Sequence, residues 1–175
     1  MQRVNIHTVP LDQAQQQRGY SWTAAALGPA IGAEAMGATL YELPPGEASF
    51  PYHYEYGCQE WLLVVTGTPT LRDPDGTHTL DAGDLVCFRE GPAGAHRLVN
   101  EGDEPSRVIL FSTKGRPAVV VFPDSAKLLA FTGDERDDVI VRRADAVDYW
   151  DGEVDRSSGT GRGANSKGNS STARS

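Results

Sequence analysis

The sequence predicts an all-β fold built on an antiparallel sheet, because its apolar runs are short, are punctuated by turn residues and follow one another closely. A chain of 175 residues is long enough for one ordinary hydrophobic core. Nineteen glycines and eleven prolines recur between the apolar runs, where a helical protein would have uninterrupted amphipathic segments. The spacings leave no room for crossover helices, so we expect the strands to pair antiparallel and to close as a barrel or sandwich.

Nine segments have strand length and strand composition. They occupy residues 38–43, 51–55, 60–65, 69–72, 77–80, 85–88, 95–100, 107–113 and 118–122. Between the fourth and the fifth, the sequence Asp-Pro-Asp-Gly at 73–76 is typical of a hairpin turn.

The regular pattern defines the expected organisation of the chain. Residues 1–37 are predicted to form an N-terminal extension of loops and an entry strand. After the barrel comes an appendage packed on it, in which Asp124 or Ser125 could cap a helix. The last residues have almost no apolar side chain to bury, so we expect them to be disordered. The predicted divisions are therefore 1–37, a barrel over 38–122, an appendage over 123–155 and a tail over 156–175.

Composition also excludes several functions. The formal net charge of −8 should repel nucleic acid and anionic lipid. No segment has the roughly 20 apolar residues that cross a bilayer, and the first residues lack the apolar centre of a signal peptide. We therefore expect a cytoplasmic protein, in which Cys58 and Cys87 remain free thiols.

Four polar side chains stand out in or beside the predicted strands. His53 and Glu55 share one face of a strand, since alternate side chains point the same way. Glu60 begins the next apolar strand, and His96 follows a glycine-rich turn at the start of another. Carboxylates and imidazoles aimed into an apolar barrel are costly to bury unless they bind a cation or one another. His7 and His78 are interpreted as surface histidines.

The spacing of these residues resembles the two motifs of the cupin superfamily. The first motif matches Gly46, His53, Glu55, Glu60 and Gly67, with glutamate in place of the usual second histidine and one extra residue after Gly46. The second matches Gly83, Gly91, His96 and Asn100, with Arg89 at the proline position and two extra residues before His96. The resemblance implies an antiparallel double-stranded β-helix, or jelly-roll, barrel.

The resemblance also implies that His53, Glu60 and His96 are metal ligands. Such a set leaves open positions on a divalent Fe, Mn or Zn ion. Glu55 could be a fourth ligand, a catalytic base in the outer shell, or the sign of a site that has lost its metal. Two close carboxylates without a cation would raise at least one pKa, so metal binding is the simplest way to keep both ionised.

The family hosts many activities, so several functions follow from the resemblance. We expect a metal-dependent enzyme acting on a small molecule, with dioxygenase-like chemistry favoured. The alternatives are a metal-dependent isomerase or lyase and a non-catalytic protein that binds a small ligand.

The resemblance to cupins that pair through their sheets also predicts a homodimer. Three tyrosines at positions 52, 54 and 56, together with Trp61, offer apolar contact area for it. The same four aromatic residues could instead line a pocket.

Overall fold

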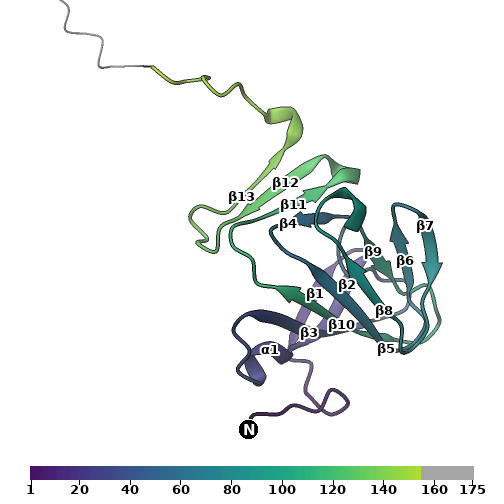
Figure 1. The fold of residues 1–175 in the computed structure, drawn as a ribbon. Helices are drawn as coiled ribbons and strands as arrows, with labels where there is room; N and C mark the ends of the chain where they lie inside the picture. Colours follow the sequence, from purple (N-terminus) through teal and green to yellow (C-terminus); the bar gives the residue numbers. More distant parts are fainter. Residues whose placement is uncertain (155–175) are drawn as a thin grey trace, which may run out of the picture. The chain divides into compact units, whose positions relative to one another are not determined.

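The computed structural model describes residues 1–154, so the predicted disordered tail, 156–175, lies outside the described residues. The chain divides into two compact units, residues 1–145 and 146–175. In the described part of the second unit the chain forms turns, and the rings of Tyr149 and Trp150 meet edge to face. The remaining description concerns the first unit, whose antiparallel sheets confirm the predicted all-β fold (Figure 1).

Strands make up nearly all the regular structure of residues 1–145. They are β1 (Gln13–Gln17), β2 (Tyr20–Ala26), β3 (Met36–Leu43), β4 (Tyr54–Tyr56), β5 (Glu60–Thr66), β6 (Thr70–Asp73), β7 (Gly76–Thr79), β8 (Leu85–Phe88), β9 (Arg97–Val99), β10 (Ser106–Thr113), β11 (Ala118–Phe122), β12 (Lys127–Phe131) and β13 (Val139–Arg142). The helical segments are short: α1 (Leu27–Ala30) and three single 3-10 turns, Pro92–Gly94, Pro123–Ser125 and Arg143–Asp145.

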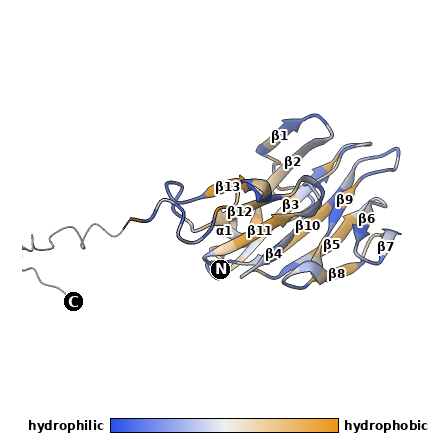
Figure 2. Ribbon diagram, turned by 90° about the horizontal axis from the view of Figure 1, so that it is seen from above, coloured by the Kyte–Doolittle hydropathy of each residue, from blue (hydrophilic) through white to orange (hydrophobic). Residues whose placement is uncertain are grey.

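The strands form three sheets, and the strand pairings within them are antiparallel. Their strand orders are β1-β2-β3-β10-β5-β8, β13-β12-β11-β4 and β7-β6-β9. The predicted hairpin at 73–76 joins β6 to β7, with Asp73 opposite Gly76. Figure 2 shows hydrophobic colour along β10 and β11 and hydrophilic colour on β1, whose sequence is QAQQQ.

The main core lies between the six-stranded and three-stranded sheets. Alternate residues of β5 and β10 point into it, because strand side chains alternate between faces with a period of two. Its fully or nearly fully buried members are Leu43, Leu62, Val64, Leu71, Leu80, Phe88, Leu98 and Val108. The opposite face of the six-stranded sheet packs in a second cluster, where Val4, Ile6, Val9 and Leu11 of the N-terminal segment cover Leu40 and Ile109.

Two segments differ from the sequence-based expectation. The N-terminal extension contributes two strands, β1 and β2, to the large sheet instead of a single entry strand. No α-helix begins at Asp124 or Ser125: the 3-10 turn there has no side-chain cap, and Ala126 ends it with a left-handed backbone, φ 49°. The apolar residues that follow pair with β11 as β12, because a neighbouring strand is available to satisfy their backbone groups.

Other expectations from the sequence can be checked directly. Cys58 and Cys87 are both free thiols. Within residues 1–154, no helix has the length and apolar character needed to cross a bilayer.

Asn100, from the second motif, is a structural residue of the barrel. Its side chain is completely buried, and its Nδ2 donates to the backbone carbonyls of Leu43 and Glu104, each at 2.8 Å. Its Oδ1 accepts from Gly102 N–H at 3.2 Å and from the Ser106 hydroxyl at 3.1 Å. One amide side chain therefore ties the end of β3 to the loop that leads into β10.

Asn100→Ala should lower the free energy of unfolding by about 2–4 kcal/mol, because it leaves several buried polar groups without a partner. Chemical denaturation measures the effect, with Glu101→Ala at the exposed neighbouring position as the control. A change below about 0.5 kcal/mol, the range of ordinary surface substitutions, would contradict the structural role.

Candidate metal centre and adjoining cavity

Two histidines from distant parts of the chain are joined through their backbones. The His53 N–H donates to the carbonyl of His96 at 3.1 Å, and the His96 N–H donates to the carbonyl of His53 at 2.8 Å. This isolated antiparallel bridge lies just before β4 and just before β9. The fold thereby places the two rings side by side, with centroids 4.6 Å apart.

Each imidazole is oriented by a second hydrogen bond within its own loop. Nδ1 of His53 lies 2.8 Å from the carbonyl of Pro51, and Nδ1 of His96 lies 2.9 Å from that of Gly94. A carbonyl only accepts, so both Nδ1 atoms carry the proton and both Nε2 atoms keep a free lone pair. The ring of His96 is also stacked on Phe88, 3.6 Å away.

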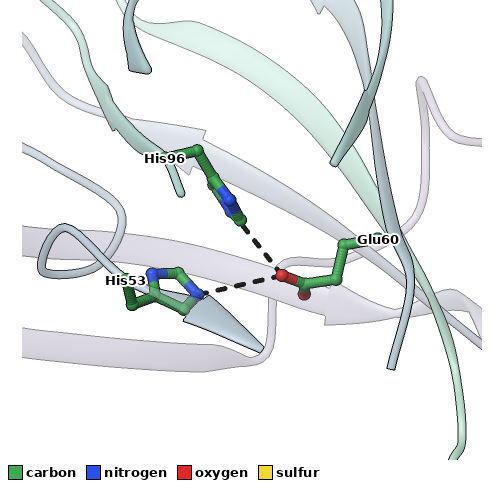
Figure 3. Close-up of side chains that lie close together, drawn as sticks. All are labelled: His53, Glu60 and His96. Atoms are coloured by element: carbon green, nitrogen blue, oxygen red, sulfur yellow. Dashed lines mark ion pairs between the residues drawn. The ribbon is translucent and has the colours of Figure 1, made fainter. Parts of the chain in front are cut away.

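Glu60, the first residue of β5, completes the group. Its Oε2 lies 3.8 Å from Nε2 of His53 and 3.6 Å from Nε2 of His96, and the three side chains point toward one another (Figure 3). Within residues 1–154, these are the three side chains whose potential ligand atoms all lie within 4.8 Å of one another.

The group has the chemistry and size of a metal site. Two ligand atoms that each bind an ion at about 2.1 Å can be at most about 4.2 Å apart, so the two separations from Glu60 fit a shared ion. Two neutral nitrogens and one anionic oxygen suit a divalent Fe, Mn or Zn ion and leave coordination positions open. The residues present therefore fit the metal that the sequence suggested.

Burial makes this group electrostatically costly without a cation. Desolvation, with the charge of Glu55 adding to it, raises the pKa of Glu60 to about 8. Burial lowers the pKa of His53, and burial together with the neighbouring His53 lowers that of His96 to about 3. At pH 7 both imidazoles are thus neutral and ready to bind a metal, whereas most of Glu60 must first lose a proton.

Glu55 lies close to this group but outside it. It belongs to β4, where it pairs with Val120 of β11, and its carbonyl accepts from Gly91 N–H at 2.7 Å. Gly91 has φ +79°, which favours glycine, at the turn that leads to His96. The backbone of Glu55 therefore links β4, in the first motif, to the turn at Gly91 in the second motif.

A cavity of about 410 Å³ adjoins the centre. Its walls combine polar groups that can orient a ligand with apolar groups that exclude water. The polar lining residues are Thr39, His53, Glu55, Glu60, Ser112 and Lys127, and the larger apolar or aromatic ones are Tyr41, Phe50, Pro51, Leu110, Val120 and Phe122.

The structure brings together three of the four predicted site residues and gives Glu55 a separate place on the cavity wall. The four aromatic residues proposed as alternative pocket walls, Trp61 and the tyrosines at 52, 54 and 56, do not line this cavity. The sequence analysis missed Tyr41, Phe50, Phe122 and Lys127. Of these, only Tyr41 had a sequence signal, namely its alternation with Leu43, which points into the core.

Two predicted surface histidines have no part in the centre. His7 is exposed. His78 is also exposed, and its Nε2 lies 3.2 Å from Asp73.

The all-β fold agrees with a comparison to known families. Residues 39–112 match the family model for the cupin domain. These residues therefore form a cupin domain. A comparison with curated proteins yields no match.

Several solved structures resemble this chain over about two thirds of its length or more. A "putative sugar phosphate isomerase" from Acidithiobacillus ferrooxidans is 29% identical, with a TM-score of 0.69, covering 74% of this chain and 81% of its own. A sugar phosphate isomerase from Silicibacter pomeroyi is 22% identical, with a TM-score of 0.72 and coverages of 82% and 94%. The polyketide cyclase RemF from Streptomyces resistomycificus is 22% identical, with a TM-score of 0.53 and coverages of 67% and 83%. The last two similarities concern the fold alone.

Metal affinity should increase with pH between about 6 and 8. In the metal-free protein Glu60 holds its proton up to a pKa of about 8, and binding must displace that proton. Calorimetry with Mn(II) at pH 7 in two buffers of different ionisation enthalpy should show release of about one proton per ion.

Glu60→Gln should bind Mn(II) weakly and without this proton release. His78→Ala, which changes an exposed histidine, should behave as the wild type. An affinity that stays constant from pH 6 to pH 8 would contradict the protonated state of Glu60.

Proposed function

We propose that this cupin is a metal-dependent enzyme that transfers a proton within a small polyhydroxylated substrate, as an aldose–ketose isomerase does. One observation carries the proposal: a single cavity is lined by His53 and Glu60 of the His53–Glu60–His96 group and by a second carboxylate, Glu55, that is not part of the group. A ligand set next to a second carboxylate would supply both the Lewis acid and the base of a metal-assisted proton transfer.

The chemistry divides between the metal and the protein. A divalent ion held by His53, Glu60 and His96 would act as a Lewis acid on a substrate carbonyl. Glu55 would remove the proton from the carbon beside that carbonyl and return it to the former carbonyl carbon. The hydroxyl proton moves to the former carbonyl oxygen, so the atoms balance and no oxidant or reductant is needed.

The remaining walls suit a polar substrate with an apolar cover. The hydroxyls of Thr39 and Ser112 and the ammonium group of Lys127 can form hydrogen bonds with substrate oxygens. Phe50 and Phe122 flank His53, with ring centroids 6.3 Å and 6.1 Å away, and limit the access of water.

The comparison with the Acidithiobacillus ferrooxidans protein supports the same reaction class. That protein is 29% identical to this chain and is named a "putative sugar phosphate isomerase". This argues for sugar phosphates as the first substrates to test. It also favours isomerase chemistry over the dioxygenase-like chemistry that the sequence alone favoured.

Oxygenase chemistry is the second candidate, and the donor set is the observation that favours it. Two histidines and one carboxylate with open positions are typical of non-haem Fe(II) oxygenases. In that case Glu55 would not act as a base, and the substrate would bind the metal directly.

A homodimer also belongs to the proposal. Trp61 and Leu85 are exposed on neighbouring strands β5 and β8, with exposed fractions of 42% and 63%, and offer apolar area to a second copy. Light scattering at micromolar concentration should give twice the mass of one chain, and a mass of 18.8 kDa would reject the dimer.

Solvent-exchange NMR tests the reaction directly. Metal-loaded protein in D₂O, supplied with aldose and ketose phosphates, should exchange the proton beside the carbonyl for deuterium and interconvert the two sugars. Glu55→Gln should keep its metal and lose turnover by about a hundredfold or more, because only the base is removed. His53→Ala and His96→Ala should lose most of their metal, and His78→Ala should lose neither metal nor turnover.

Two results would overturn the isomerase. Loss of metal from Glu55→Gln would make Glu55 a fourth ligand in place of a base. Absence of exchange with every sugar phosphate, together with oxygen consumption by the Fe(II)-loaded protein on catechols, diketones or keto acids, would establish the second candidate.

A further inference from the structure

A second cavity, of about 320 Å³, adjoins the first and contains neither histidine of the metal centre. The two cavities share the lining residues Glu55, Glu60, Ser112 and Val120. They therefore meet at the two carboxylates, and a substrate whose reactive end lies at the metal centre can extend past Glu55 into the second space.

The second cavity differs from the first in its charge. Lys114 and Arg116 line it, and neither forms an ion pair with any residue between 1 and 154. Burial raises the pKa of its one thiol, Cys58, to about 11, so that thiol adds no negative charge at neutral pH. In a chain with a net charge of −8, two such cations beside one cavity favour an anionic ligand.

The loop that carries both cations is fixed in place. A Cβ atom on Gly115 would clash with the Gly57 carbonyl oxygen, so the loop lies directly against the turn before β5. Thr113 N–H donates to the Gln59 carbonyl at 3.0 Å, and Lys114 N–H donates to that of Ala35 at 3.2 Å. These bonds hold the loop on two sides.

The two cationic side chains are not equivalent. The guanidinium of Arg116 lies over the ring of Phe131, 5.3 Å from its centroid, and both residues line the cavity. The ammonium of Lys114 already donates to the carbonyl of Ala33 at 3.4 Å. Arg116, whose planar fork can bind two oxyanion oxygens at once, is therefore the main candidate for recognising an anion.

We infer that the second cavity is a subsite for the phosphate or carboxylate group at the far end of the substrate, with Arg116 as its principal binding residue. The inference rests on the proposed function and specifies its substrate class: a polyol with a reactive carbonyl at one end and an oxyanion at the other. Lys127, which lies on the metal side of the carboxylates, contacts the reactive end instead.

Matched pairs of ligands test this subsite by calorimetry with Mn(II)-loaded protein. Fructose 6-phosphate should bind at least about tenfold more tightly than fructose, and glucuronate compared with glucose provides the carboxylate arm. Arg116→Met should reduce the affinity for the preferred anion about tenfold or more and leave the uncharged partner within about twofold. Arg136→Met, whose guanidinium pairs with Asp134 outside both cavities, is the control and should change neither.

The variants of the two cavities show in which of them the anion binds. A preference for the anion that disappears in Lys127→Met but persists in Arg116→Met places the anion in the first cavity and overturns the subsite. Equal binding of charged and uncharged partners by the wild type overturns it as well. Binding of inorganic phosphate to the metal-free protein that is lost in Arg116→Met supports it without reference to turnover.

Binding and turnover also distinguish the two proposals. Tight, Arg116-dependent binding without turnover leaves the subsite standing and removes the isomerase. Turnover of a sugar phosphate that Arg116→Met does not affect keeps the isomerase and removes the subsite.

Discussion

The reciprocal pair of backbone hydrogen bonds between His53 and His96 is the constraint on which the rest of the site depends. Each histidine satisfies the other's N–H and carbonyl, so their backbones cannot separate without exposing unpaired polar groups in a buried region. The Nδ1 hydrogen bonds to Pro51 and Gly94 then fix the rings, and β5 supplies Glu60 opposite them. The ligand atoms are thus arranged by the barrel itself, before any ion binds.

That arrangement has an electrostatic cost. Glu60 is held in a low-polarity environment beside Glu55, and its pKa rises from an ordinary 4.5 to about 8. A raised folded-state pKa means that the contribution of Glu60 to stability is present below pH 4.5 and is lost as the pH rises toward 8. A bound cation favours the ionised carboxylate and reverses this loss. The barrel therefore buries a carboxyl group, that of Glu60, which is stabilised only when it is protonated or paired with a positive charge.

Most of the barrel and the three clustered side chains could be predicted from the sequence, because both depend on local periodicity and motif spacing. The walls of the cavity could not. Phe122 and Lys127 line it because β11 pairs with β4 and β12 pairs with β11, and no local pattern specifies which strands become neighbours. The strand β1 was missed because QAQQQ has no apolar alternation, and its pairing with β2 supplies what its composition lacks. Glu55 shows the limit of alternation: a period of two gives its face but not its distance from the His53–Glu60–His96 group.

Different parts of the sequence supply the three clustered side chains and the later walls of the two cavities. All three clustered side chains belong to the stretch that matches the cupin model, whereas β11, β12 and the loop carrying Arg116 follow it. These later segments form walls without holding any of the three ligand atoms. Substitutions at Val120, Phe122 or Lys127 can therefore reshape the cavity while the geometry of the His53–Glu60–His96 group stays intact, which makes β11 and β12 the natural place to redesign the cavity.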